Sequence, residues 1–357
     1  MKVLMHGASW GTEHYRDFVT EGLKDNLGAQ NIYQYMPSVY RERPDLISHC
    51  IVDHSRNIQD VSECDKFDLI IFCYNSFFDK DFKSFLNYNT SATKIYIDHE
   101  DSFFIKRLYL EKNIDYYFKR EVLNNPPMLK VAEWTLRFLY GNYYATWKGM
   151  KISPKWFMNP LYLPYKYSFG KSLTQLKKLR KFSITYAPGD ADIVKNVDTK
   201  RGYDLSFMMN LQRIQERRHL YGYLLKMEKD FPNQRMFIKP GDVERKKYVD
   251  VLLRSKASIS VRGLSYNAFR YWEIPYYGAM LLSKRTPLII PHDWVDGESA
   301  LFFDENEELR QKFEKYVVKS DEWKEIARKG RANYFNYHTP KKLINDMVLE
   351  KIRKGMP

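Results

Sequence analysis

Cysteine is scarce in this sequence of 357 residues, which contains three. They are Cys50, Cys64 and Cys73, and no two of them have the spacing of a metal-binding pair. A small, odd number of cysteines argues against a disulfide-stabilised secreted domain. We therefore expect reduced thiols in a cytoplasmic protein.

Long hydrophobic runs are also missing. No apolar stretch reaches the roughly 18 residues of a transmembrane helix. The apolar run within Met1–Gly7 is too short for a signal peptide and predicts a first strand instead. We expect a cytoplasmic protein, with peripheral contact at the inner membrane face as the alternative.

Two familiar ligand motifs give no convincing site in this sequence. The loop Gly7–Thr12 after the first predicted strand lacks a full G-x-G-x-x-G, so we predict no dinucleotide site there. The segment Asp190-Ala191-Asp192 spells D-x-D, but it follows Pro188-Gly189 and is more simply a turn. The sequence therefore predicts no metal site and no resident cofactor.

Strands and helices alternate along the chain, and its length is sufficient for two domains. The expected strands cover 2–6, 31–36, 66–75, 94–97, 114–118, 203–209 and 235–239, and the expected helices cover 13–27, 80–87, 243–255 and 340–353. Such alternation is typical of parallel, doubly wound sheets. A basic linker at 175–181 suggests a domain boundary near residue 181.

Positive charge is concentrated in one part of the chain. The formal net charge is +14, and residues 111–182 contain 14 Lys/Arg against 4 Asp/Glu, with many Tyr, Trp and Phe between them. Such a region could bind nucleic acid through its phosphates or lie on anionic lipid headgroups. The alternative is a solvated basic face with its aromatic side chains in the core.

The stretch from Arg262 to Ser283 carries the strongest functional signal. A β-branched run at 257–261 precedes it, and a second apolar run at 279–282 lies near its end. Between them, Arg270 and Glu273 are three residues apart and leave the same face of a predicted helix. In a βαβ unit an arginine can neutralise a diphosphate and a carboxylate can accept hydrogen bonds from a ribose diol. The alternative is an Arg–Glu pair on a solvated face.

The pattern that begins at Arg270, R-x-W-E-I-x-x-x-G-A-x-L-L-S, resembles the donor-site signature of GT-B glycosyltransferases. The similarity is to the group 1 and CgeB-like (spore maturation protein) branch, with local similarity to phage DNA β-glucosyltransferases. It continues through the segment 292–303 and through Tyr337-His338-Thr339, so it covers roughly the last hundred residues. The first half of the chain matches only loosely.

This resemblance implies an α/β protein of the GT-B class, with two Rossmann-like doubly wound domains facing a central cleft. Residues 1–181 would form the acceptor-binding domain and residues 182–337 the nucleotide-sugar-binding domain. Residues 338–357 would form a C-terminal helix that crosses back to the N-terminal domain.

The resemblance also implies the donor-site residues. Glu273 would bind the donor ribose, and Arg270 would approach the diphosphate. Arg213 and Arg217 stand four apart at the start of a helix, as do two diphosphate-binding arginines in the phage enzymes. The loop residues Arg262 and Gly263 would complete the donor-binding set. The nucleotide sugar, with UDP favoured, would be a co-substrate, and no metal would be required.

The catalytic base is expected from the N-terminal domain. Asp98-His99-Glu100-Asp101 directly follows a predicted strand, and Asp101 occupies the position of the catalytic aspartate in the phage enzymes. Asp98 and His99 are the other candidates, and a solvated loop is the alternative. Many retaining members have a second acid where this chain has Ser265, so the stereochemistry stays open.

Two lone histidines and the acceptor complete the expectations. His6 and His14 could contact sugar or phosphate, although lone histidines are more often structural. The favoured function is a hexosyltransferase-like enzyme that acts on a glycan, glycolipid or other surface acceptor. One alternative is transfer to hydroxylated bases of DNA. Others are a non-catalytic nucleic-acid-binding protein and a peripheral membrane protein.

Overall fold

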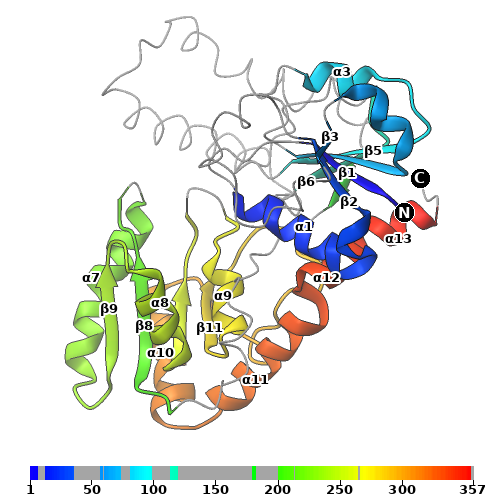
Figure 1. Cartoon of the computed structure of the whole chain (residues 1–357). Helices are drawn as coiled ribbons and strands as arrows, with labels where there is room; N and C mark the ends of the chain where they lie inside the picture. Colours follow the sequence, from blue (N-terminus) through cyan, green and yellow to red (C-terminus); the bar gives the residue numbers. More distant parts are fainter. Residues whose placement is uncertain are drawn as a thin grey trace, which may run out of the picture.

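Two β-sheets of parallel strands, each packed against helices, form the core of this protein in a computed structural model (Figure 1). The structure describes residues 1–6, 13–35, 57–58, 60–73, 81–98, 113–119, 179–181, 200–212, 214–263 and 266–354. Each sheet has hydrophobic side chains on both faces, as expected for parallel strands covered by helices.

The N-terminal sheet has the strand order β3-β2-β1-β4-β5-β6-β7, and its strand pairs are parallel. Its strands are β1 (Val3–His6), β2 (Ile32–Tyr35), β3 (Asn57–Ile58), β4 (Leu69–Cys73), β5 (Thr93–Asp98), β6 (Tyr116–Lys119) and β7 (Leu179–Lys181). Helix α1 (Glu13–Leu27) follows β1, and α3 (Phe82–Asn87) precedes β5.

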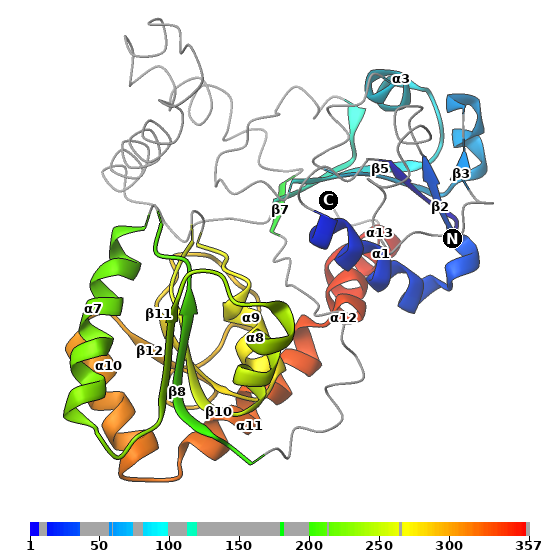
Figure 2. The ribbon, with the colours of Figure 1, turned by 60° about the vertical axis from the view of Figure 1, so that its left-hand side comes forward.

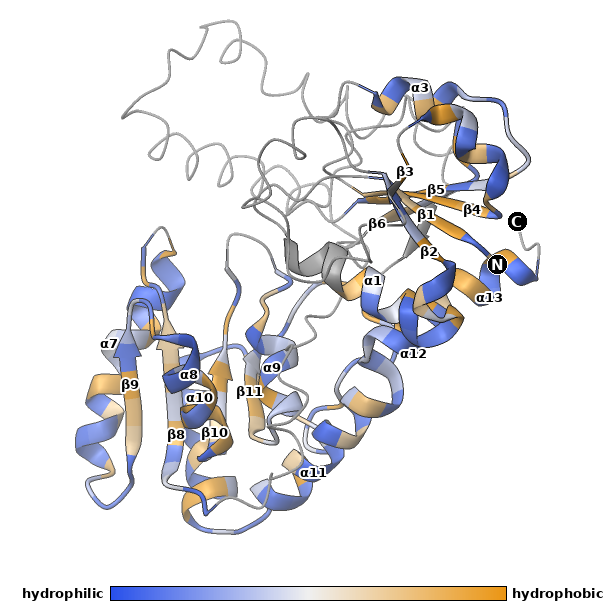
Figure 3. Ribbon diagram, viewed as in Figure 1, coloured by the Kyte–Doolittle hydropathy of each residue, from blue (hydrophilic) through white to orange (hydrophobic). Residues whose placement is uncertain are grey.

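Strand periodicity sends alternate side chains of this sheet to two different cores. Val3 and Met5 of β1 pack against α1, whereas Leu4 lies in the other cluster, which includes α3. The central strands β1 and β4 are accordingly coloured as largely hydrophobic in Figure 3. The helix predicted at 13–27 is confirmed as α1, which ends at Gly28 with φ 83°.

The C-terminal end of the chain packs against the N-terminal sheet's core. Thr339 caps the first helical turn by accepting from the amide of Lys342, and Pro340 occupies a first-turn position. The helical run then continues through α12 (Pro340–Ile344), a π-helical turn η12 (Asn345–Leu349) and α13 (Glu350–Arg353). Leu343, Ile344 and Val348 are buried in the same cluster as β1 and α1 (Figure 1).

A glycine permits this helix contact. A Cβ at Gly22 of α1 would lie 2.4 Å from Ile344 Cγ1 and 2.5 Å from the carbonyl oxygen of Pro340. Asn26, one turn later, donates from Nδ2 to the carbonyl oxygen of Lys341 at 2.8 Å. The close approach of α1 and α12 therefore depends on a missing side chain.

The C-terminal sheet has the strand order β12-β11-β10-β8-β9, again with parallel pairs. Its strands are β8 (Tyr203–Met209), β9 (Met236–Pro240), β10 (Ser255–Ser260), β11 (Met280–Lys284) and β12 (Leu301–Phe303). Its helices are α7 (Gln215–Asp230), α8 (Arg245–Leu253), α9 (Arg270–Tyr276), α10 (Asn306–Phe313) and α11 (Trp323–Asn333).

Helices cover both faces of this sheet (Figure 2). One buried cluster joins the strands to α7, α10 and α11, and a second joins them to α8, α9 and the π-helical turn η11 (Tyr334–His338). Helix α11 also lies very close to the segment before β12, because a Cβ at Gly330 of α11 would be 2.4 Å from the carbonyl oxygen of Ser299. These helices bury the sheet on both sides and leave its strand ends for other contacts.

Candidate functional site

The carboxyl ends of β8 and β10 flank the point where the strand order of the C-terminal sheet reverses. The chain leaves β8 for β9 on one side and then returns to β10 on the other side of β8. Ligands of open α/β sheets bind at such a point, outside the carboxyl ends of the strands. The residues around this edge are therefore the candidates for a ligand site.

Arg217 joins the two strand ends. Its guanidinium donates to the carbonyl oxygens of Asn210 after β8, at 3.1 Å, and of Arg262 after β10, at 2.9 Å. A third, longer bond of 3.4 Å reaches the carbonyl oxygen of Val261. Arg217 is thus a buried residue whose side chain fixes the two loops at the reversal point.

Like charges surround Arg217. Burial, and after it the nearby charges of Arg270 and Arg262, lower the pKa of Arg217 to about 10. Arg262 pairs with Glu216 of α7 at 3.3 Å, and Lys284 at the end of β11 lies 3.9 Å from the same carboxylate. One carboxylate therefore faces several cations, which leaves positive charge at this edge.

Glu273 of α9 is a buried carboxylate with hydrogen-bond partners on a neighbouring helix. Its Oε1 accepts from Arg245 Nη1 at 2.7 Å, and its Oε2 accepts from the Tyr248 hydroxyl at 2.7 Å. Arg245 and Tyr248 both belong to α8, which begins just after the carboxyl end of β9. We call Arg245, Tyr248 and Glu273 the Glu273 clamp. The side chain of Glu273 is 5% exposed, whereas that of Arg245 is 43% exposed.

Arg270 connects the cations to the Glu273 clamp. Its guanidinium lies over the Tyr248 ring, 5.7 Å from the ring centroid. Its Nε is buried and has no hydrogen-bond partner within the described parts of the chain. A buried donor of this kind is costly unless a ligand accepts from it. Arg270 therefore offers an anion a hydrogen bond beside Arg217.

The predicted donor-site residues have different outcomes. The structure brings Arg217, Arg262, Arg270 and Glu273 to one edge, and Gly263 directly follows Arg262 there. Arg213 lies outside the described residues. Glu273 is buried and pairs with Arg245, so the alternative of an Arg270–Glu273 pair on a solvated face does not describe this helix.

Arg245 and Tyr248 were not predicted as site residues. They lie 28 and 25 residues before Glu273 in the sequence, on another helix. The available signal was their spacing of three within the predicted helix 243–255, which places both side chains on one face. Nothing in the sequence shows which face of which helix they meet.

The N-terminal candidates are only partly described. Asp98 ends β5 and is 1% exposed, and its Oδ2 accepts from the Tyr117 hydroxyl at 2.6 Å. His99, Asp101 and the side chain of His14 lie outside the described residues, as does most of the basic segment 111–182. His6 is buried among aromatic rings, stacked on Tyr35, and burial lowers its pKa to about 3. A neutral, buried His6 has a core role.

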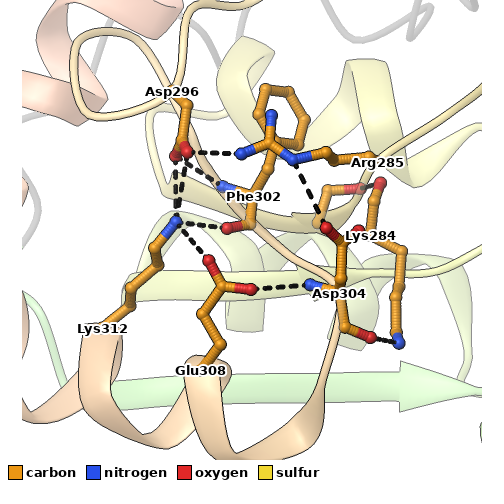
Figure 4. Close-up of polar contacts among 8 residues, drawn as sticks. Lys284, Arg285, Asp296, Phe302, Asp304, Glu308 and Lys312 are labelled. Atoms are coloured by element: carbon orange, nitrogen blue, oxygen red, sulfur yellow. Dashed lines mark hydrogen bonds and ion pairs between the residues drawn. The ribbon is translucent and has the colours of Figure 1, made fainter.

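A network of charged side chains lies next to the carboxyl end of β11 (Figure 4). Asp296 accepts from Arg285 at 2.8 Å, from the amide of Phe302 at 2.9 Å and from Lys312 of α10 at 3.2 Å. Lys312 also pairs with Glu308 at 3.0 Å. These bonds connect α10 and β12 to Arg285, which directly follows Lys284 at the end of β11.

In the described parts of the chain, no group of three or more His, Cys, Asp or Glu side chains is placed to hold a metal ion. The D-x-D segment at 190–192 lies outside them. Cys64 and Cys73 are buried, and Cys50 is not among the described residues. None of the helices that the structure describes has the length and apolarity to span a membrane.

Comparison with known proteins places this geometry in context. Residues 205–348 match the family described as glycosyl transferase-like. Among solved structures, an alpha-glucosyltransferase in complex with UDP-glucose and DNA containing an abasic site has a TM-score of 0.52 and 9% identity, over 99% of this chain and 98% of that one. HepE from Anabaena, in complex with UDP and glucose, has a TM-score of 0.50 and 10% identity, over 99% and 100%. The chain has the GT-B fold.

Other comparisons add less. In the GtfA/B complex the chain spans 59% of the matched protein's length, with 82% of this chain covered, 9% identity and a TM-score of 0.44. No curated protein matches the chain. The residues at the reversal point, including the Glu273 clamp, lie in the glycosyl transferase-like part of this GT-B protein, whereas Asp98 lies outside it.

Proposed function

We propose that this protein is a glycosyltransferase that moves a sugar from a nucleoside diphosphate sugar, with UDP favoured, to an acceptor hydroxyl. The observation that carries the proposal is the arrangement at the strand-order reversal. Within the part of the chain that the structure describes, the buried Nε of Arg270 beside Arg217 has no hydrogen-bond partner, and the Glu273 carboxylate lies on the same helix face. The glycosyl transferase-like match over residues 205–348 supports it.

The arrangement suits the leaving group of this reaction. Breaking the bond to the sugar leaves negative charge on the diphosphate. Guanidinium groups that are already in place stabilise that charge without reorganisation. Arg270 would donate directly, while Arg217 and Arg262 supply positive potential. We propose that these arginines replace a metal ion and that Glu273 accepts from the donor ribose.

The base is proposed to come from the N-terminal domain. Asp98, His99 and Asp101 remain the candidates, because Asp98 ends β5 and the other two follow it in the sequence, where ligands of α/β sheets bind. Asp98 is buried, and its carboxylate accepts from the Tyr117 hydroxyl. We propose Asp101 as the base, with Asp98 holding the end of the strand.

The acceptor is proposed to be a glycan, a glycolipid or another surface hydroxyl. The R-x-W-E pattern at Arg270 supports placing the protein in the CgeB-like branch. Transfer to hydroxylated DNA bases is the second candidate. The concentration of Lys, Arg and aromatic residues in 111–182 favours it. The DNA complex of the similar alpha-glucosyltransferase is in line with this candidate.

A ligand panel tests the donor. Thermal unfolding would be measured with UDP, GDP, CMP and dTDP sugars, for the wild type and Glu273→Gln. A ligand present at a hundred times its Kd stabilises the native state by about 2.7 kcal/mol. We expect one nucleotide family to stabilise the wild type and to lose most of its effect in the variant.

The control is Glu325→Gln, which removes an exposed carboxylate paired with Arg328 in the same domain. Its response to the ligands should match the wild type. No stabilisation of the wild type by any donor would refute the proposal and favour a nucleic-acid-binding protein, whose DNA affinity should fall steeply with salt. Transfer of labelled sugar to hydroxymethylated DNA, but not to glycolipid, would select the second acceptor.

A further inference from the structure

We propose that Arg245 and Tyr248 are positioning residues that orient Glu273 toward both hydroxyls of a ribose, so that the site selects ribonucleotide donors over 2′-deoxyribonucleotide donors. The inference rests on the proposed function and goes beyond it. It assigns two residues of α8 to donor specificity. It also predicts which nucleotides the site rejects.

Helix geometry makes the pair of contacts possible. Arg245 and Tyr248 are three residues apart, so both side chains leave one face of α8. That face meets α9, where Glu273 lies, and the two helices belong to the same buried cluster. Arg245 Nη2 also donates to the Tyr277 hydroxyl at 3.1 Å, beyond the end of α9. The guanidinium is therefore held at two points and fixes the carboxylate from one side.

The hydrogen bonds leave Glu273 with acceptor capacity on both oxygens. An ionised carboxylate has about four acceptor positions, two on each oxygen. Arg245 occupies one position on Oε1 and Tyr248 occupies one on Oε2. Among the described residues, these oxygens accept from no other donor. A cis-diol can therefore donate one hydroxyl to each oxygen, whereas a 2′-deoxyribose leaves one of them without its partner.

Tyr248 adds a link between the two ends of the donor. Its hydroxyl donates to Glu273, which would face the ribose, and its ring supports Arg270, which would face the diphosphate. Burial, and then the charge of Glu273, raise the pKa of Tyr248 well above its usual value, so the phenol stays protonated and remains a donor. Removing the hydroxyl alone should therefore free the carboxylate and leave the support of Arg270 in place.

A ratio of affinities separates positioning from a general structural role. Dissociation constants would be measured by calorimetry for UDP against 2′-deoxy-UDP and for GDP against 2′-deoxy-GDP. The wild type should bind the ribonucleotide of its preferred pair about tenfold more tightly, because a buried acceptor without a partner is costly. In Tyr248→Phe and Arg245→Gln this ratio should fall toward one, and Arg245→Lys should recover part of it.

Matched controls come from the same helices. In α9, Tyr271→Phe removes a hydroxyl that donates to Asp293 at 2.6 Å. In α8, Lys247→Gln removes a positive charge. Both should keep the ratio of the wild type. Arg245 is partly exposed, so its variants should fold even if Tyr248→Phe does not.

The outcomes distinguish the positioning role of Arg245 and Tyr248 from the proposed function. A wild type that binds a ribonucleotide, with Arg245 and Tyr248 variants that weaken both members of the pair equally, would overturn the positioning role and leave the proposed function intact. A wild type that binds neither UDP nor GDP would overturn both. A lowered ratio confined to the Arg245 and Tyr248 variants would support the inference.

Discussion

Arg217 donates from Nε to the carbonyl oxygen of Arg262 at 2.9 Å, so two arginines are held together at the point where the strand order reverses. Like charges in contact are unfavourable unless other groups compensate them. Glu216 compensates Arg262 in part, at 3.3 Å. The bond to the main chain keeps Arg217 in place in spite of the remaining repulsion. A bound anion would relieve it.

The first prediction concerns this relief. Arg270→Gln should weaken the binding of UDP and of inorganic pyrophosphate about ten- to hundredfold, because hydrogen bonds to charged groups contribute roughly 1.5–3 kcal/mol. Arg217→Gln should weaken binding and also lower the thermal midpoint without ligand, since carbonyl oxygens at two strand ends lose their donor. Calorimetry and thermal unfolding measure the two effects separately.

Arg254→Gln is the control for this prediction. Arg254 is a partly exposed arginine of the same domain that lies over the Tyr203 ring and pairs with Asp250 at 3.6 Å. Its loss changes the net charge equally but should leave the affinity for pyrophosphate within about twofold, because exposed charges are screened by salt. An equal loss in Arg254→Gln and Arg270→Gln would mean that the attraction is non-specific.

The sequence predicted the fold through local signals. Apolar runs and their alternation located β1, β4, β8 and β10 to within a few residues, and Gly28 marked the end of α1. The final helix was predicted as one element, but a π-helical turn interrupts it at 345–349. Such turns depend on packing against other parts of the chain, which a single segment does not encode.

The site was predictable only where its residues are close in sequence. Arg270 and Glu273 were found because a spacing of three fixes their relative direction on any helix. Their partners were missed because Arg245 and Tyr248 reach Glu273 across two packed helices. The burial of Arg217 was likewise hidden, since its acceptors Asn210, Val261 and Arg262 come from two separate strand ends.

The second prediction tests the packing of the C-terminal helix on α1. Gly22→Ala adds a methyl group where Ile344 Cγ1 and the Pro340 carbonyl already lie within 2.5 Å. The helices must separate, which should cost about 1–3 kcal/mol and exceed the gain of up to about 1 kcal/mol from helix propensity. Urea unfolding measures the net loss.

Gly222→Ala is the control for the second prediction. Gly222 lies in α7, and among the described residues its added Cβ would meet no atom within 4 Å outside the helix's own backbone. This change should stabilise the protein by about 0.5–1 kcal/mol. The double variant Gly22→Ala, Ile344→Ala should be less destabilised than the sum of the single changes, because removing the Ile344 side chain relieves the clash. Additive effects would contradict the proposed contact.

The third prediction concerns Asp293, a partly buried carboxylate that contacts Tyr271 of α9 although it lies outside that helix in the sequence. Its Oδ1 accepts from the Tyr271 hydroxyl at 2.6 Å and from the amide of Trp294 at 2.8 Å. Burial raises the pKa of Asp293 from 3.8 to about 6 in the folded state. The folded protein therefore holds this proton more tightly than the unfolded chain between these values. The associated stability is fully present below pH 3.8 and is lost as the pH rises through 6.

Asp293→Asn should remove this dependence. The amide oxygen can accept the same two hydrogen bonds without a charge, so the variant should be more stable than the wild type at pH 8, by up to about 3 kcal/mol. At pH 4 the two proteins should have nearly equal free energies of unfolding. His338, whose pKa burial lowers to about 4, destabilises both proteins in acid, so the informative quantity is the difference between them at each pH. A difference that stays constant from pH 4 to pH 8 would show that Asp293 is not strained by burial.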